Sequence, residues 1–494
     1  MSVRYEPVIG LEVHAQLLSK SKLFSPASNA FGGTPNTQIS PVCLALPGAL
    51  PVPNRGAVEM AVSAALALGC QVRLKSRFDR KHYFYPDLPK GYQISQYEFP
   101  FAEDGEVKLE VEGKARRIRI QRIHMEEDAA KNIHGSSTAK ETLVDFNRAG
   151  VPLVEIVTHP DLQSALEAEL YLRRLREVLL FVGVNDGNLE EGSFRCDANV
   201  SIRPVGQSEL GTRVELKNIN SFRFVRKAIE HEITRQEAIL GNGGKVSMET
   251  RMWSERQGKT LSMRGKEQAH DYRYFPDPDL PPLVIPEAMI RALRDSLPEL
   301  PEAKRMRWQR DYGLTSADAH VLTGHPRVAE FFEQTVSLMP KMTKNIQPDS
   351  SARLGKRVAN FMQAELLRHT KTMGLSASFP VEPTAVVELL DLVDRGTISG
   401  KMAKDVFGAM LKTGRSASQV VEEQGLVQVT DSAAIEAEIR KVFEAHPEKV
   451  AQYNAGKTTL LGFFVGQVMR ATKGASNPQL LNQTLKTMLE SRKP

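Results

Sequence analysis

The spacing of hydrophobic residues changes once along this 494-residue chain, and that change constrains the fold more than any other feature of the sequence. Up to about residue 290, apolar residues alternate with polar ones or form short runs, which is typical of β-strands with a few helices between them. Beyond this point the apolar spacing is helical nearly to the end. The segment 277–286 is too rich in proline for the interior of a helix or a sheet, so it marks a domain boundary.

The first strand shows the two-residue period clearly, because residues 9–17 alternate between an apolar face and a polar face. Two helices interrupt the strands, one opened by the capping box of Ser164 and Glu167 and one running from about residue 222 to Gly241. We therefore predict an α+β fold. It consists of a large domain with a mostly antiparallel sheet at 1–290, an all-α helical domain at 291–410 and a small helical tail at 411–494.

Composition excludes several classes of protein. No run approaches the ~18 uninterrupted apolar residues that a membrane span needs, so we expect no membrane association. The first residues lack the pattern of a secretory signal, and three widely spaced cysteines argue against a disulfide framework. We therefore expect a cytoplasmic protein. The net charge of +6 permits a polyanionic partner without proving one.

Two segments have the residue types of a metal site. Glu12 and His14 are two residues apart on one strand face, so a carboxylate and an imidazole point the same way. The segment 124–134 places two histidines around three consecutive acids at 126–128, whose oxygens suit Mg²⁺ or Mn²⁺. The alternatives are an exposed polar strand face for the first segment and a solvated acidic loop for the second.

The segment 190–203 forms a third candidate site. Its extended form would have one polar face, consisting of Arg195, Asp197, Asn199, Ser201 and Arg203. Arginine with aspartate and asparagine can hold a phosphate together with its metal ion. The segment 215–221 adds Glu215, Lys217 and two asparagines. The alternative is a polar face with internal salt bridges.

Basic and aromatic residues mix in the segments 79–87, which contains Lys81, 90–97 and 269–279. Such side chains stack on bases and bind phosphates, so a nucleotide or an RNA end is a candidate ligand. The alternative is that the aromatic residues pack a loop over the sheet. The chain has no P-loop, no G-x-G-x-x-G motif opening a helix after a strand and no G-x-S-x-G elbow. These residues alone leave the reaction open.

The C-terminal segment 456–494 carries six lysines and arginines against one acid, so most of the charge excess lies there. A basic surface of this kind suits a folded RNA backbone. We expect this tail to bind nucleic acid, with Arg470 and Lys473 among its contacts. The alternative is a solvated helix whose cations cluster by chance.

Eight motifs occur in order over nearly the whole chain. They are Ile-Gly-Leu-Glu-Val-His at 9–14, Pro-Gly-Ala-Leu-Pro at 47–51, Asp-Arg-Lys-His-Tyr-Phe-Tyr-Pro-Asp at 79–87, Glu-Glu-Asp-Ala-Ala-Lys at 126–131, Pro-Leu-Val-Glu-Ile-Val at 152–157, Glu-Gly-Ser-Phe-Arg-Cys-Asp-Ala-Asn at 191–199, Glu-Leu-Lys-Asn at 215–218 and Gly-Gln-Val-Met-Arg-Ala-Thr-Lys-Gly at 466–474. Together they closely resemble the GatB/GatE family, to which the GatB component of the tRNA-dependent amidotransferase GatCAB belongs.

The resemblance implies a cradle-shaped catalytic domain, then a helical domain and a tail like the YqeY proteins. It also implies an activity. The family uses ATP and Mg²⁺ to activate the side-chain carboxylate of Glu-tRNA(Gln) or Asp-tRNA(Asn) as an acyl phosphate, which ammonia then converts to the amide. In the family, the glutaminase GatA supplies the ammonia and GatC holds GatA and GatB together. The sequence does not show which of the two tRNAs is used.

The resemblance also implies roles for individual residues. The metal ligands carried over by motif are Glu12, His14, Glu127 and Glu155. Whether Glu126 or Glu127 is the ligand stays open, because adjacent residues on a strand face opposite ways. The catalytic residues implied are Glu127, Glu155, Asp197, Arg195 and Lys81, and the cofactor contacts are Arg203, Lys217 and Asn199.

One segment departs from the family pattern. Some members carry a zinc-type set of four cysteines after the first strand, whereas this chain keeps only Cys43, with Ser25, Ala27 and Ser40 at the other places. We therefore expect no zinc. Two other function classes remain as hypotheses. A tRNA-binding scaffold would leave the acids and histidines scattered, and a stand-alone ATP-grasp-like ligase would need a glycine-rich phosphate loop.

Overall fold

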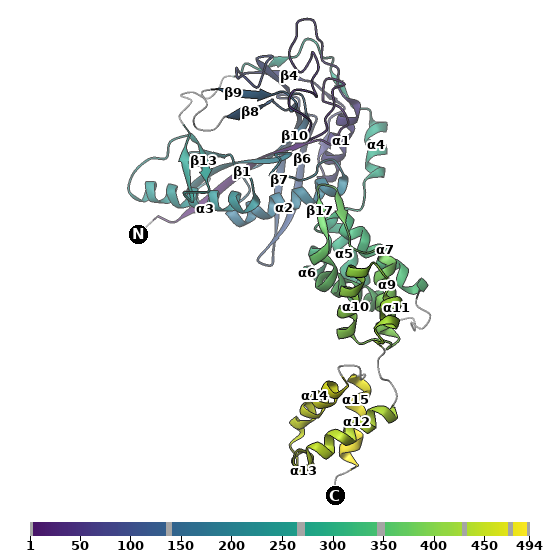
Figure 1. The fold of residues 1–494 in the computed structure, drawn as a ribbon. Helices are drawn as coiled ribbons and strands as arrows, with labels where there is room; N and C mark the ends of the chain where they lie inside the picture. Colours follow the sequence, from purple (N-terminus) through teal and green to yellow (C-terminus); the bar gives the residue numbers. More distant parts are fainter. Residues whose placement is uncertain are drawn as a thin grey trace. The chain divides into compact units, whose positions relative to one another are not determined.

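A nine-stranded sheet forms the centre of the N-terminal part of the chain (Figure 1). The computed structural model describes residues 3–134, 141–263, 272–342, 351–426, 432–472 and 478–491. The strands follow one another in the order β14 (Lys259–Ser262), β13 (Glu249–Ser254), β12 (Val214–Lys217), β11 (Phe194–Pro204), β1 (Tyr5–Gln16), β10 (Pro152–Thr158), β7 (Lys114–Glu127), β6 (Ala102–Val111) and β2 (Gln71–Val72). Only β12 and β13 pair in parallel among these described strands, so the prediction of a mostly antiparallel sheet is confirmed.

Helices cover one face of this sheet. Figure 1 shows α2 (Ala165–Val182) and α3 (Phe222–Gly241) running beneath the strands, and α1 (Arg55–Ala67) also packs against this layer. The apolar residues of β1, β7, β10 and β11 face these helices and form one continuous core with them. The opposite face of the long strands is therefore left for polar side chains.

Both ends of α2 lie where the sequence predicts them, but one predicted hydrogen bond of its N-terminal cap is not formed. Ser164 caps the helix by accepting a hydrogen bond from the Glu167 N–H at 3.1 Å, and Gly183 ends it with φ 77°. The second hydrogen bond of a capping box, from the N–H of Ser164 to the Glu167 side chain, is replaced by two other hydrogen bonds. The Glu167 carboxylate accepts from the Gln163 N–H at 2.7 Å and from Arg116 at 3.0 Å, because the neighbouring strand β7 brings a guanidinium to it.

Small sheets lie over one end of the polar face. The largest has the order β15 (Phe275–Pro276), β4 (Asp79–His82) and β5 (Tyr92–Ser95). Two further pairs are formed by β3 (Lys75–Ser76) with β16 (Leu283–Val284) and by β8 (Lys131–His134) with β9 (Thr142–Asp145). Hydrogen bonds from Ser95 and Gln93 to Glu126 tie β5 to the end of β7. This contact closes a layer of side chains between the two sheets.

Contacts divide the chain into two compact units, one of residues 1–304 with 373–375 and one of 305–372 with 376–494. Helix α4 (Glu287–Ser296) belongs to the first unit. The second unit is helical except for a short hairpin that β17 (Lys371–Met373) and β18 (Ser376–Ser378) form beside it. Its α-helices are α5 (Pro301–Tyr312), α6 (Ser316–Leu322), α7 (Pro326–Met342), α8 (Ser351–Phe361), α9 (Pro383–Asp394), α10 (Gly400–Thr413), α11 (Ala417–Glu423), α12 (Ser432–Ala445), α13 (Pro447–Asn454), α14 (Leu461–Ala471) and α15 (Pro478–Glu490). The described part of the predicted helical domains is thus mainly helical, and the hairpin within 291–410 is the departure from the all-α prediction.

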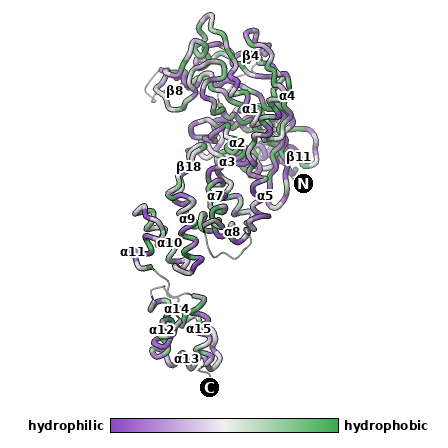
Figure 2. The backbone as a smooth tube through the Cα atoms, turned by 90° about the vertical axis from the view of Figure 1, so that its right-hand side faces the viewer, coloured by the Kyte–Doolittle hydropathy of each residue, from purple (hydrophilic) through white to green (hydrophobic). Residues whose placement is uncertain are grey.

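Residue 411, the predicted start of the tail, lies inside a helix. Helix α10 runs through this position, and α11 packs against α9 and α10. A separate apolar cluster begins only at Ile435 and ends at Leu489. The tail therefore has its own core, which starts after α11. Figure 2 shows hydrophobic and hydrophilic residues mixed along the helices of both units, and none of the described helices is both long and apolar enough to cross a membrane.

Candidate functional site

The polar face of β1 carries the first part of the site. Glu12, His14 and Gln16 lie on this face, while Ile9, Leu11, Val13 and Ala15 are buried on the helix side, as the two-residue period predicts. The strand lies between β11 and β10, with His14 opposite Glu155 in one neighbour and Arg195 in the other. Side chains directly opposite one another on neighbouring strands are within contact distance.

Three adjacent strands bring four ionisable side chains together. Glu155 on β10 is opposite His14 on β1 and opposite His124 on β7. Its carboxylate is 3.2 Å from His14 Nε2 and 3.3 Å from His124 Nε2. Two residues beyond His124, the carboxylate of Glu126 lies 3.1 Å from the same His124 nitrogen. The ligand atoms of His14, Glu126 and Glu155 all lie within 4.8 Å of one another.

The geometry separates the two adjacent glutamates that the sequence left open. Glu126 joins His14 and Glu155, whereas the Glu127 carboxylate accepts from Lys90 and from the Ile94 N–H at 3.1 Å. Of the two adjacent glutamates, Glu126 is thus the one whose carboxylate lies near His14 and Glu155, while the metal-ligand role given to Glu127 stays a prediction. The physical reason is the alternation of side chains along β7, where His124 and Glu126 share one face.

Electrostatics within the cluster favour charged carboxylates. Burial lowers the pKa of His124, but the carboxylates of Glu155 and Glu126 outweigh burial and raise that pKa to about 9. Burial raises the pKa of Glu155, but His124 and His14 outweigh it and hold the pKa well below its usual range. Lys81 on β4 adds an ammonium, on a partly exposed side chain, 3.9 Å from Glu126. The cluster is therefore a buried set of donors whose charge is compensated by neighbouring cations.

This donor set fits a divalent cation. Two carboxylates and one imidazole nitrogen are ligand types that divalent metals accept, and hydrogen bonds orient both carboxylates. Glu126 accepts from Ser95 at 2.5 Å and from Gln93 at 3.0 Å. Glu155 is fixed from both sides by the two histidines. The residues that would hold a metal are therefore His14, Glu126 and Glu155.

A second row of charged groups follows on β11 and β12. Glu12 accepts a 2.8 Å hydrogen bond from Asn199, and Asp197 is 3.0 Å from the Lys217 ammonium. Burial and the nearby carboxylate of Glu155 raise the pKa of Glu12. The structure thus places these four predicted residues beside the metal-type cluster on the same face of the sheet. Glu12 is not among the three residues whose ligand atoms lie within 4.8 Å of one another, and its role as a metal ligand stays a prediction.

Two further predicted residues on β11 differ in position. Arg195 donates to Asp128 at 2.8 Å, and Gln16 donates to the same carboxylate, so Arg195 lies at the cluster end of the strand. Arg203 is opposite Glu6, six residues before Glu12 on β1, and it donates to Glu6 at 2.7 Å. At ~3.3 Å per residue, these six residues separate Arg203 from the level of Glu12 by ~20 Å along the strand. Arg203 therefore lies along β11 at a distance from the cluster, and its role as a cofactor contact stays a prediction.

The four positions at which some family members carry zinc-binding cysteines, 25, 27, 40 and 43, lie close together, but only one of them offers a sulfur atom. The Ser40 and Ser25 hydroxyls lie 3.2 and 3.6 Å from the Cys43 sulfur, and Ala27 packs against Cys43. The ammonium of the buried Lys22 donates to a backbone carbonyl beside them at 3.3 Å. One sulfur with two hydroxyls is not the donor set of a structural zinc site.

Sequence reasoning missed two neighbours of the cluster. His124 stood out only as part of an acidic segment, although its two-residue spacing from Glu126 was visible. Lys90 stood out only as part of the basic and aromatic segment 90–97, and its ion pair with Glu127 could not be foreseen because Glu127 lies on a different strand. In the tail, Arg470 is exposed on α14, whereas Lys473 lies outside the described residues.

Comparison with known proteins adds independent information. The GatB/GatE catalytic domain matches residues 7–291, and the GatB domain of the YqeY type matches residues 343–489. The chain is similar to proteins named as the B component of aspartyl/glutamyl-tRNA(Asn/Gln) amidotransferase. The protein of Thermodesulfovibrio yellowstonii is 50% identical over 489 residues, covering 99% of this chain and 100% of the relative. The protein of Syntrophotalea carbinolica is 52% identical over 490 residues, covering 99% of each.

Proposed function

The chain belongs to the GatB/GatE family, and we propose that it is the GatB component of an amidotransferase that converts misacylated Glu-tRNA(Gln), Asp-tRNA(Asn) or both into the amide forms. The observation that carries this proposal is the convergence of His14, Glu126 and Glu155, with Lys81 beside them. A scaffold that only binds tRNA has no need of a buried cluster of this kind. Perturbed, buried ionisable groups of this type are common at catalytic sites.

The proposed reaction has two steps. A side-chain carboxylate oxygen of the aminoacyl group attacks the γ-phosphorus of ATP, ADP leaves, and an acyl phosphate forms. The nitrogen of ammonia then attacks the acyl carbon, phosphate leaves, and the nitrogen loses a proton to give the amide. The first step is needed because a carboxylate alone has no adequate leaving group. Phosphoryl transfer depends mainly on positioning and on neutralising negative charge.

The residues of the site supply these two requirements. Lys81 holds its ammonium next to Glu126, where it can attract phosphoryl oxygens. Arg195 and Lys217, each held by an aspartate, provide further cations along the same sheet face. A divalent cation, Mg²⁺ in this proposal, would neutralise negative charge on the phosphates when bound by His14, Glu126 and Glu155. Burial of Glu126 and Glu155 strengthens the interactions that these two carboxylates make, because water screens them less.

Two partner proteins complete the proposal. We place ammonia production on a glutaminase, GatA, and the link between GatA and this chain on GatC. The support is that this chain lacks an amidase-type Gly-Gly-Ser-Ser-Gly-Gly run, and its cysteines lie in no recognisable glutaminase motif. In the tail, Arg470 and Lys473 are proposed contacts for the tRNA body, supported by the charge excess of 456–494.

The test is amide formation from misacylated tRNA by the assembled enzyme, with ammonium chloride or glutamine as the nitrogen donor. We expect ATP-dependent product with both donors. Glu155→Gln should abolish product with both donors while glutamine hydrolysis by the glutaminase continues. Product formation that persists in Glu155→Gln would contradict the proposal and would favour the scaffold hypothesis.

A further inference from the structure

A buried lysine beside a cysteine forms a cluster that none of the reaction steps proposed above uses. Lys22 is 0% exposed, and its ammonium donates to the Phe146 carbonyl at 3.3 Å and to the sulfur of Cys43. The carboxylates of Glu127 and Asp145 act on it only from a distance, and no described carboxylate forms an ion pair with it. A buried ammonium is costly unless an acceptor or an anion faces it. Among the described residues, the ionisable group that it contacts is the Cys43 thiol.

Two hydroxyl groups complete the surroundings of this sulfur. The Oγ atoms of Ser40 and Ser25 lie 3.2 and 3.6 Å from Cys43 Sγ. The Cys43 N–H donates to Ser40 Oγ at 3.3 Å, so this oxygen is already an acceptor and its own proton can be donated to the sulfur. Donors from three residues thus converge on one sulfur. Hydrogen bonds to the charged form of a thiol stabilise the thiolate.

The other two cysteines of the chain have no such set of donors among the described residues, so they serve as references. Cys70 is 6% exposed, nearly the same as the 7% of Cys43. Burial raises the pKa of Cys70 to about 12 and also raises the pKa of Cys196. At Cys43 the two serine hydroxyls and the Lys22 ammonium outweigh burial and lower the pKa of the thiol. The thiolate is the nucleophilic form of cysteine, so the three thiols should differ in reactivity although all are buried.

The sulfur lies against the backbone that carries Asp128. Cys43 packs against Ala130, and a Cβ atom placed on Gly150 would be in van der Waals contact with the sulfur at 3.6 Å. The Gly150 N–H in turn donates to the Asp128 carbonyl at 2.9 Å, and the Asp128 carboxylate is 2.8 Å from Arg195. An atom added to the sulfur must therefore fit between backbone segments that hold these charged groups in place.

We propose that Cys43, paired with Lys22, is a site of reversible oxidation by hydrogen peroxide. The thiolate sulfur attacks one peroxide oxygen, the O–O bond breaks and a sulfenic acid forms, while the other oxygen leaves as hydroxide and takes up a proton to become water. The sulfur loses two electrons, which the peroxide gains. A small thiol then attacks the sulfenic sulfur, water leaves and a mixed disulfide forms. A second thiol attacks this disulfide and releases Cys43 in its original state.

Oxidation of Cys43 should also lower amide formation, and this effect rests on the proposed function. The added oxygen needs space beside Gly150, and movement of this backbone displaces Asp128 from Arg195. A small misplacement of groups at a reacting centre can cost a large factor in rate. We therefore expect oxidation to lower kcat at least ~10-fold.

The test measures how fast each cysteine of the folded full-length chain is oxidised. Hydrogen peroxide is added together with dimedone, which traps sulfenic acid, and the three cysteine-containing peptides are quantified by mass spectrometry. We expect labelling of Cys43 to be at least ~10-fold faster than that of Cys70, because each unit of pKa changes the fraction of thiolate about tenfold. In the chain unfolded by urea, all three cysteines should react at similar rates, because the neighbouring donors are then lost.

Two variants remove the proposed cause by different routes. Lys22→Met removes the ammonium but keeps an unbranched side chain, and it should slow labelling of Cys43 about tenfold. Lys20→Met is the matched control, because it removes the same charge from an exposed side chain two residues away; labelling should change by less than about twofold. Ser40→Ala removes only a hydroxyl and should slow labelling about fivefold, which provides a test that leaves Lys22 in place.

Equal labelling of Cys43 and Cys70 in the folded wild-type chain would overturn the proposal. Unchanged labelling of Cys43 in folded Lys22→Met and Ser40→Ala variants would do the same. The effect on catalysis is measured in the assembled enzyme, where peroxide should lower amide formation by the wild type, dithiothreitol should restore it, and Cys43→Ser should be insensitive to peroxide.

An equal loss of activity in the wild type and in Cys43→Ser would refute the effect of this cysteine on amide formation. Failure of the proposed function has a different signature. No amide product would form even before peroxide is added, whereas the faster labelling of Cys43 would persist.

Discussion

Glu126 and Glu127 offer a matched pair of substitutions that tests the geometry of the cluster directly. Both side chains are buried, at 2% and 4% exposure, and each becomes glutamine with almost no change in size. Only Glu126 faces His14 and Glu155. Glu127 faces Lys90 instead. We therefore expect Glu126→Gln, but not Glu127→Gln, to remove a metal ligand.

The contacts set the expected magnitude. Even residues that only support a metal ligand change metal affinity by ~10–100-fold, so loss of a direct carboxylate ligand should cost at least ~100-fold. This corresponds to about 2.7 kcal/mol. The Glu127 charge is already compensated by Lys90, so its removal should change the affinity by less than ~10-fold. Both variants leave a partly buried lysine without its carboxylate partner, Lys81 for Glu126→Gln and Lys90 for Glu127→Gln, and both should therefore lose thermal stability.

The assay is calorimetric titration of the full-length chain with MnCl₂, after circular dichroism has shown that each variant is folded. Mn²⁺ serves as the probe because it accepts the same oxygen and nitrogen ligands as the proposed site. The reasoning is refuted if Glu127→Gln weakens Mn²⁺ as much as Glu126→Gln does, or if Glu126→Gln binds as tightly as the wild type.

Further predictions concern other parts of the chain. Glu12→Gln should lower amide formation at least ~100-fold with tRNA affinity nearly unchanged, because this carboxylate lies beside the cluster and not on an RNA-binding surface; a loss of tRNA binding would count against it. Arg203→Ala should leave amide formation within about twofold, since its ion pair with Glu6 is partly exposed and worth about 0–1 kcal/mol, and a large loss would support the predicted cofactor role. Arg470→Ala should reduce the salt dependence of tRNA binding by about one phosphate contact, and removal of residues 427–494 should raise the KM for aminoacyl-tRNA; unchanged values would make the tail a packing module. The purified chain without partners should not hydrolyse glutamine, which an assay for released glutamate checks.

The amino-acid sequence alone accounts for the local structure and for most of the residue types of the site. The alternation in residues 9–17 places Glu12 and His14 on the polar face because side chains on any strand alternate. The N-cap Ser164 and the terminal Gly183 define α2 through interactions within a few residues of each end. Contacts of this range depend on the neighbouring sequence alone, so they can be derived without the fold.

Which of these residues meet depends on the pairing of distant strands. Glu155 lies between His14 and His124 only because β10 pairs with β1 on one side and with β7 on the other in one register. A shift of one residue would turn the whole set to the opposite face. The choice of Glu126 over Glu127 follows from the same pairing.

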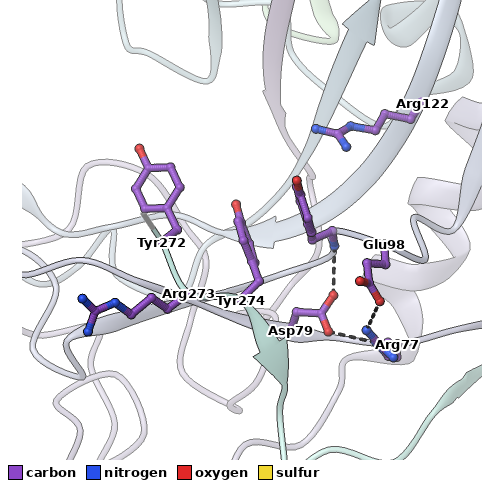
Figure 3. Close-up of a pocket in the computed structure, with 8 residues that line it drawn as sticks. Arg77, Asp79, Glu98, Arg122, Tyr272, Arg273 and Tyr274 are labelled. Atoms are coloured by element: carbon purple, nitrogen blue, oxygen red, sulfur yellow. Dashed lines mark hydrogen bonds and ion pairs between the residues drawn. The ribbon is translucent and has the colours of Figure 1, made fainter. Parts of the chain in front are cut away.

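A cavity on the polar face of the sheet and the position of Arg203 were also beyond the reach of sequence patterns. This cavity of about 610 Å³ is lined by Arg122, which a bulge in β7 places on the polar face, and by Tyr274, which comes from a segment about 150 residues later in the chain (Figure 3). Arg203 shares a strand face with Asp197 but lies too far along β11 to reach the cluster. A periodic pattern gives the face of a residue, whereas its distance from a site on other strands depends on long-range pairing, which is visible only in the folded chain.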